Sequence, residues 1–155
     1  MRYLTVALAL ATSLFGTANA GDIKLYPGAS CQAVGGARSY VINGLIRNDS
    51  SGSAVDINCP IARDATGSTS IRVYVEDKHF NQDVACYTSS VNDYNYAGSW
   101  SPWVRSSGVT GAIPTPLDLP TTSGTSSSFQ YVTCTLPPVY SGQMSGLRSM
   151  FVNEN

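Results

Sequence analysis

The chain of 155 residues has few charged side chains, with 9 Lys and Arg against 10 Asp and Glu and a net charge of −1. It contains no basic cluster, which binding to a nucleic acid or to an anionic membrane surface would require. No apolar run approaches the roughly 20 residues of a membrane-spanning helix. We therefore expect no transmembrane segment and no nucleic acid partner, while the oligomeric state stays open.

The chain also lacks the usual marks of an enzyme. His79 is the only histidine, and no G-x-S-x-G motif accompanies it, so a Ser-His-Asp site has no support and His79 is expected in an exposed loop. The four cysteines form no CxxC pair of the kind that binds zinc. The sequence favours a non-enzymatic protein with no catalytic residues, no cofactor and no metal.

Two chemistries based on acidic residues remain as alternatives. A hydrolase would need two carboxylates across a cleft, and Glu76, Asp77 and Asp83 are close enough in sequence to be candidates. A calcium site could draw oxygen ligands from Asp77, Asn81 and Asp83, with Asp93 as a further donor, although the EF-hand spacing is absent. Solvated turn residues are the favoured interpretation of this cluster.

The first 20 residues match a secretory signal peptide. Met1-Arg2 provides the positive start, Leu4 to Phe15 is a short apolar stretch, and Ala18-Asn19-Ala20 is an A-x-A cleavage site. We expect cleavage after Ala20, a secreted or periplasmic protein, and a single domain over residues 21–155. Removal of Arg2 makes the mature chain slightly more acidic.

Export changes the interpretation of the four cysteines. An even number of cysteines in an oxidising compartment predicts disulfides, and three pairings are possible. The preferred pairing joins Cys31 to Cys59 and Cys86 to Cys134. The first bond would tie the Gly-rich N-terminal segment to the domain, and the second would join two strands with matching apolar faces.

Short segments with apolar residues at alternate positions predict β-strands. The expected strands include residues 40–46, 55–61, 71–76, 84–86, 129–136 and 147–153. Asn43-Gly44 lies inside an apolar run, and we interpret this glycine as a bulge. Strands separated by turn-forming residues predict an all-β fold, an antiparallel β-sandwich of about seven to eight strands stapled by two disulfides.

Residues 87–103 are the most distinctive segment. They hold five aromatic residues among Asn, Asp, Gly and Ser: Tyr87, Tyr94, Tyr96, Trp100 and Trp103. Aromatic rings can cover the apolar face of a sugar while polar neighbours bond its hydroxyls, and the same mixture forms adaptable protein-binding loops. The alternative is that Trp100 and Trp103 cap one end of the core. We select Tyr94, Tyr96, Trp100 and Trp103 as candidate contacts for a carbohydrate or another surface protein.

The chain resembles small secreted bacterial disulfide-bonded β-proteins of unassigned function. The resemblance is carried by the signal peptide, Tyr26-Pro27-Gly28, Cys59-Pro60, the strand end at residues 73–77 and the other three cysteines. It implies secretion, two disulfides and a β-sandwich, and it carries no catalytic residues. The chain also resembles secreted pilin-like subunits, but more weakly. It lacks the aromatic next-to-last residue of those subunits, since residues 154–155 are Glu and Asn.

Three hypotheses follow from these patterns. The leading one is a secreted, non-enzymatic module that binds a glycan or a cell surface. The alternative is a structural or adhesive subunit of an extracellular assembly, which predicts an exposed strand edge or an open groove. A hydrolase using the acids of residues 76–83 comes third.

Overall fold

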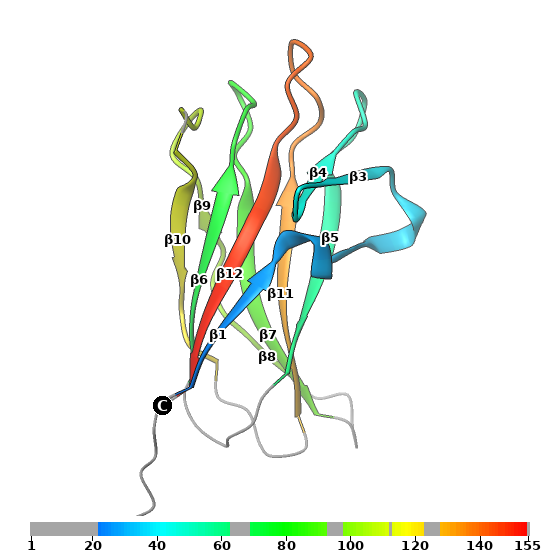
Figure 1. Cartoon of the computed structure of the whole chain (residues 1–155). Coiled ribbons are helices and arrows are strands. Elements are labelled where there is room, and N and C mark those ends of the chain that lie inside the picture. The colour runs from blue at the N-terminus through cyan, green and yellow to red at the C-terminus, as the bar shows by residue number, and fades with distance from the viewer. Residues whose placement is uncertain (1–21, 63–68, 93–97, 112, 123–127, 155) are drawn as a thin grey trace, which may run out of the picture.

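The computed structural model describes residues 22–62, 69–92, 98–111, 113–122 and 128–154. They form two antiparallel sheets that pack face to face, as Figure 1 shows, which confirms the expected β-sandwich. The strands are β1 Asp22–Pro27, β2 Gln32–Ala33, β3 Ser39–Ile42, β4 Leu45–Asn48, β5 Val55–Ile61, β6 Thr69–Glu76, β7 Ala85–Asn92, β8 Gly98–Trp100, β9 Val104–Arg105, β10 Thr115–Leu119, β11 Ser128–Leu136 and β12 Gly146–Glu154.

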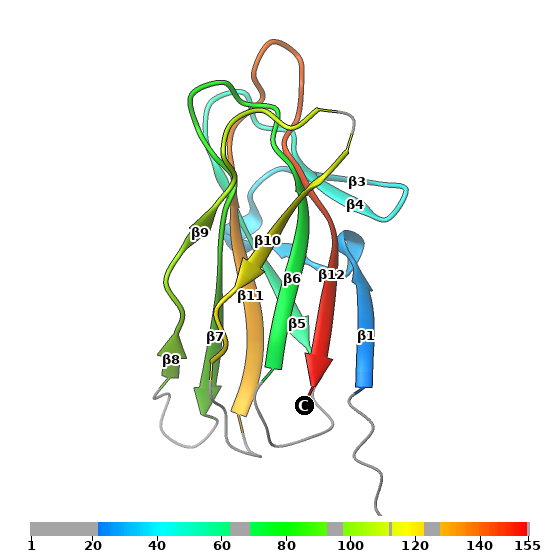
Figure 2. The ribbon, with the colours of Figure 1, turned by 90° about the vertical axis from the view of Figure 1, so that its left-hand side faces the viewer.

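Within the described residues, each sheet has six strands. Sheet A has the order β10-β6-β12-β4-β3, and β1 also pairs with β12. Sheet B has the order β2-β5-β11-β7-β8, and β9 also pairs with β7. Figure 2 shows the layers edge-on, with β7, β8, β9 and β11 on one side and β6, β12 and β1 on the other. Across the described ranges, no helix is long and apolar enough to span a membrane.

The core lies between the sheets and follows the alternation of the sequence. In β5, every second residue from Val55 to Ile61 is buried and the intervening ones are exposed. β11 repeats the pattern with Val132, Cys134 and Leu136 pointing inward. Because alternate residues point to opposite sides of a sheet, the other residues of these strands face outward and are available for a site.

Both disulfides lie in this core. Cys31 is bonded to Cys59 of β5, and Cys86 of β7 is bonded to Cys134 of β11. This is the pairing preferred from the sequence. Cys86 and Cys134 are direct partners in the β7–β11 register, so this disulfide links neighbouring strands of sheet B beneath its outer face.

The bulge expected at Asn43-Gly44 is wrong. These residues form the turn of a hairpin between β3 and β4, in which Ile42 pairs with Leu45. Asn43 and Gly44 have φ values of 51° and 78°. Positive φ at both central residues matches a type I′ turn, for which Asn-Gly is the preferred sequence. The expected strand at residues 40–46 is therefore two strands.

The described residues also contain more strands than the seven to eight expected. Three of the extra ones, β2, β8 and β9, have only two or three residues. Such short segments contain too few residues for alternation to be recognised, and they become strands because a longer neighbour supplies the hydrogen bonds.

Glu76 joins three strands of sheet A. Its carboxylate accepts hydrogen bonds from Arg47 of β4 at 2.8 Å and from Arg148 of β12 at 2.9 Å. Burial alone would raise the pKa of Glu76, but the hydrogen bonds from Arg148 and Arg47 outweigh it and the pKa lies below its ordinary value of 4.5. The carboxylate therefore stabilises the fold when it is ionised.

The folded-state pKa of Glu76 is lower than the unfolded one, so this stabilisation is present above about pH 4.5 and is lost as the pH falls through the folded-state value. We expect Glu76→Gln to lower the free energy of unfolding at pH 7, and we expect this difference to shrink progressively as the pH falls below about 4.5. Urea unfolding of both proteins across this range measures the difference. A difference that does not change with pH would contradict the assignment.

Candidate functional site

Strand pairing aligns aromatic residues on the outer face of sheet B. Trp100 of β8 pairs with Ser89 of β7, Ser89 with Tyr131 of β11, and Tyr131 with Pro60 of β5. Directly paired residues of antiparallel strands point to the same side of a sheet. Since Val132 points into the core, Tyr131 and its whole row point outward.

The neighbouring row contributes another aromatic pair. Tyr87 of β7 pairs with Thr133 of β11, which pairs with Asn58 of β5. The indole of Trp103 lies against Tyr87, with ring centroids 4.4 Å apart and an edge-to-face angle of 62°. We call Tyr87, Trp100, Trp103 and Tyr131 the aromatic platform.

The two indoles lie at the surface. Trp100 is 60% exposed and Trp103 is 48% exposed, so neither caps the core. Tyr87 and Tyr131 are half-buried. The other two candidate contacts selected from the sequence, Tyr94 and Tyr96, lie outside the described residues.

Gly98 leaves space for the indole of Trp100. A Cβ added at Gly98 would stand 3.1 Å from Cζ2 and Cη2 of Trp100 and 3.0 Å from the carbonyl oxygen of Ser90. A side chain at this position would therefore push the indole away. The Gly-Ser-Trp sequence of β8 thus helps to set the position of the ring on the platform.

Polar groups border the platform. A pocket of about 380 Å³ has Trp103 on its wall, and its other lining residues are Asn81, Gln82, Asp83, Ala85, Arg105 and Thr135. On the sheet itself, the hydroxyl of Thr133 donates to Oδ1 of Asn58 at 2.9 Å. The outer face therefore offers hydroxyl, amide and charged groups beside exposed rings.

Tyr131 was not selected from the sequence. Its outward direction follows from the alternation in residues 129–136, but its place in the same row as Trp100, with Ser89 between them, depends on the pairing of β11 with β7 and of β7 with β8. The pairing of strands that are distant in the sequence produces no pattern in the local sequence, so it could not be predicted from it. Tyr87 belonged to the aromatic segment, and only its contact with Trp103 places it in the platform.

The acids of residues 76–83 do not share a cleft. The carboxylate of Glu76 accepts hydrogen bonds from two arginines, and Asp77 is fully buried. Asp83 lines the pocket beside Trp103. Among the described residues, no group of three or more His, Cys, Asp or Glu side chains could hold a metal ion. Asp93, the further calcium ligand considered, lies outside the described ranges.

The expected exposure of His79 is wrong. The side chain is buried, and its ring lies 4.8 Å from that of Tyr140. Nδ1 accepts a hydrogen bond from the backbone N–H of Asn81 at 3.1 Å. The loop folds inward because the carboxylate of Asp77 accepts the backbone N–H of His79, which brings the imidazole against the protein.

The fold of this chain is similar to that of the xylan-binding module CBM15. That match has a TM-score of 0.54 and 14% identity, and it covers 86% of this chain and 97% of the other. No family model matches the chain, and no curated protein matches its sequence.

A second similar structure contains the CBM22-1 and GH10 modules of the Clostridium thermocellum endo-1,4-beta-D-xylanase 10B, complexed with xylohexaose. Its TM-score is 0.57 at 11% identity, covering 87% of this chain and 28% of that longer one. At these identities the similarity is one of fold. The sandwich is thus shared with carbohydrate-binding modules.

Proposed function

We propose that this protein is a non-enzymatic module that binds a glycan chain through the outer face of sheet B. The observation that carries the proposal is the aromatic platform, in which exposed rings in adjacent rows lie beside amide, hydroxyl and carboxylate groups. The similarity of the sandwich to a xylan-binding module supports the proposal at the level of fold.

The platform has the chemistry that a sugar requires. Indole and phenol rings can cover the apolar C–H faces of a pyranose, and their desolvation contributes binding energy. Asn58 and Thr133 can bond sugar hydroxyls from the floor, and Asn81 and Asp83 can do so from the pocket edge. Aromatic contacts give affinity, while the polar groups select the arrangement of hydroxyls.

The extent of the face favours an oligosaccharide over a single sugar. The row from Trp100 to Pro60 crosses four strands, β8, β7, β11 and β5. With a strand spacing of about 4.8 Å, this row is roughly 14 Å long. We therefore expect affinity to rise with the number of sugar units until the platform is covered.

Isothermal titration with xylohexaose, cellohexaose and mannohexaose tests the proposal. For the sugar that binds, Trp100→Ala and Trp103→Ala should each weaken binding about 10- to 100-fold, because truncating an aromatic hot spot costs roughly 2 kcal/mol or more. Tyr40→Ala is the matched control, since Tyr40 is an exposed aromatic residue on β3 of sheet A. Binding unchanged in both Trp variants, or no binding of any neutral glycan, would refute the proposal.

A structural or adhesive role is the alternative proposal. It is favoured by β3, which ends sheet A and whose four residues are all exposed, among them Val41 and Ile42. An exposed apolar edge strand can pair with another chain. Light scattering at high protein concentration tests this alternative, and a monodisperse monomer would exclude self-assembly through this edge.

A further inference from the structure

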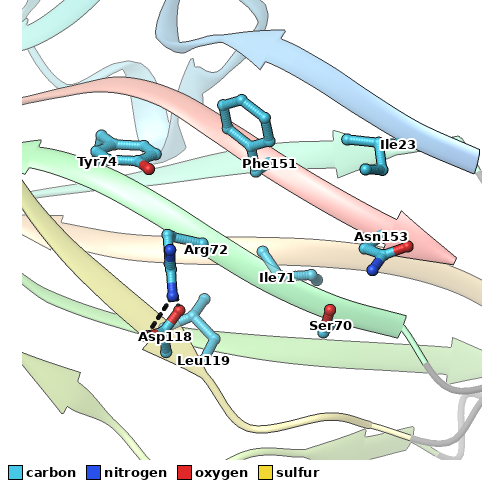
Figure 3. Close-up of a pocket in the computed structure, with 9 residues that line it drawn as sticks. All are labelled: Ile23, Ser70, Ile71, Arg72, Tyr74, Asp118, Leu119, Phe151 and Asn153. Atoms are coloured by element: carbon cyan, nitrogen blue, oxygen red, sulfur yellow. Dashed lines mark hydrogen bonds and ion pairs between the residues drawn. The ribbon is translucent and has the colours of Figure 1, made fainter.

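The opposite side of the sandwich carries a second pocket. It lies on the outer face of sheet A, has a volume of about 330 Å³, and is drawn in Figure 3. Its lining residues come from β1, β6, β10 and β12, and they include Ile23, Arg72, Tyr74, Asp118, Phe151 and Asn153. We call it the sheet A pocket. None of its residues belongs to the aromatic platform.

One side of the sheet A pocket is apolar and exposed. The rings of Phe151 and Tyr74 stand on the neighbouring strands β12 and β6 with centroids 6.0 Å apart and an angle of 68° (Figure 3). Ile23 of the edge strand β1 is 63% exposed, and Phe151 is 41% exposed. These side chains offer an apolar wall that a small ligand can desolvate.

The other side carries a pair of opposite charges. Nε and Nη2 of Arg72 donate to Oδ1 and Oδ2 of Asp118 at 2.6 and 3.0 Å. These hydrogen bonds hold the pKa of Asp118 below its usual range, so the pair stays ionised near neutral pH. Its charges compensate each other, and neither side chain is buried.

This charge pair limits the class of ligand. A guanidinium has five N–H donors, and Asp118 uses two of them, which leaves donors on Arg72 and lone pairs on Asp118 for further hydrogen bonds. A charged ligand would meet attraction and repulsion at the same place. An uncharged ligand with several hydroxyls can bond both groups while its apolar face covers Phe151 or Tyr74.

We propose that the sheet A pocket is a second glycan site, which takes one or two rings of a neutral sugar chain. The volume lies at the lower end of the range for small-molecule sites, about 300–1,000 Å³. If the platform of sheet B also binds a glycan, as proposed above, the protein is bivalent. The two sites face opposite directions, so one molecule holds two separate chains rather than two parts of one.

Titration of the double variant Trp100→Ala/Trp103→Ala separates the two proposals. Amide NMR spectra of this variant are recorded with xylohexaose, cellohexaose, mannohexaose and, as an anionic probe, a hexamer of galacturonic acid. Saturable shifts at Arg72, Phe151 and Asn153 with a neutral hexasaccharide support the sheet A pocket. No shift there with any neutral sugar overturns it, whatever the wild-type platform binds. Stronger shifts with the anionic hexamer also overturn the proposed class of ligand.

Two further substitutions in the same background test the residues. Phe151→Ala should weaken binding of the neutral hexasaccharide to the sheet A pocket at least tenfold. Arg72→Gln leaves the aromatic wall intact and should also weaken this binding at least tenfold. The second variant keeps the test valid if Phe151→Ala fails to fold. Affinity unchanged in a folded Arg72→Gln variant overturns the role of the charge pair.

Crosslinking of a polysaccharide tests bivalency. A neutral polysaccharide built from the sugar that binds should become turbid when mixed with the wild-type protein, because each molecule joins two chains. Trp100→Ala/Trp103→Ala and Arg72→Gln should each strongly reduce turbidity, although each leaves one site intact. Turbidity equal to that of the wild type in either folded variant would overturn the two-site arrangement.

Discussion

Replacing Asp77 by alanine is expected to lower the free energy of unfolding by about 3–5 kcal/mol. The side chain is completely buried, and its carboxylate accepts four hydrogen bonds. The donors are the backbone N–H groups of His79 at 3.0 Å and Val84 at 3.2 Å, and the hydroxyls of Ser106 at 2.5 Å and Ser145 at 3.4 Å. Alanine would leave the backbone N–H of His79 and the hydroxyl of Ser145 without this acceptor, and the N–H of Val84 would keep only its hydrogen bond to Oγ of Ser106 at 2.9 Å.

This loss is large relative to a domain stability of about 5–15 kcal/mol. Urea unfolding measures it, with Asp83→Ala as the control, because Asp83 is half-exposed and its one hydrogen bond within the described residues, from Gly108, is long at 3.5 Å. The control should change stability by less than about 0.5 kcal/mol. If the free energy of unfolding of Asp77→Ala lay within 1 kcal/mol of the wild-type value, the role assigned to this carboxylate would be contradicted.

Asp77 also connects stability to the proposed site. The hydrogen bonds of Asp77 hold the loop of residues 77–84 against residues 106–110. The loop of residues 77–84 also supplies Asn81 and Asp83 to the pocket beside Trp103. Any folded fraction of Asp77→Ala should therefore bind glycan more weakly than the wild type, although Asp77 has no contact with solvent.

The sequence was sufficient to predict the class of fold. Alternation in residues 55–61, 71–76 and 132–136 identifies strands that the structure contains, and it also separates their buried from their outward residues. This works because burial of one face of a sheet imposes a period of two on the sequence. The disulfide pairing could be preferred for the same reason, since Cys86 and Cys134 lie on buried faces.

Features that depend on distant partners could not be predicted in this way. Asp77 resembles a solvated turn residue until Ser106 and Ser145 are placed beside it. Likewise, Arg72 meets Asp118 only because β6 pairs with β10. The local sequence predicts which face of the sheet a side chain points to. Which residues come together in a site depends on which strands pair with each other.

Removal of the Cys86–Cys134 disulfide is expected to have an effect of similar size to the loss of Asp77. The bond closes a loop with a sequence separation of 48 residues. Restriction of the unfolded chain over such a loop is worth about 4 kcal/mol in the chain-entropy model. We expect Cys86→Ala/Cys134→Ala to lower Tm by roughly 10–15 °C, as measured by differential scanning calorimetry under oxidising conditions.

The matched control removes the other disulfide, Cys31–Cys59, whose separation is 28 residues and whose loss should cost slightly less. The two variants should differ in binding more than in stability. Cys86 and Cys134 join β7 and β11, whose outer faces carry Tyr87 and Tyr131, whereas Cys31 lies before β2 and Cys59 lies on β5, and neither of these strands contributes a ring to the platform. Loss of Cys86–Cys134 should therefore weaken glycan binding even at temperatures where the protein is folded, and equal affinities for the two variants would show that strand pairing alone positions the platform.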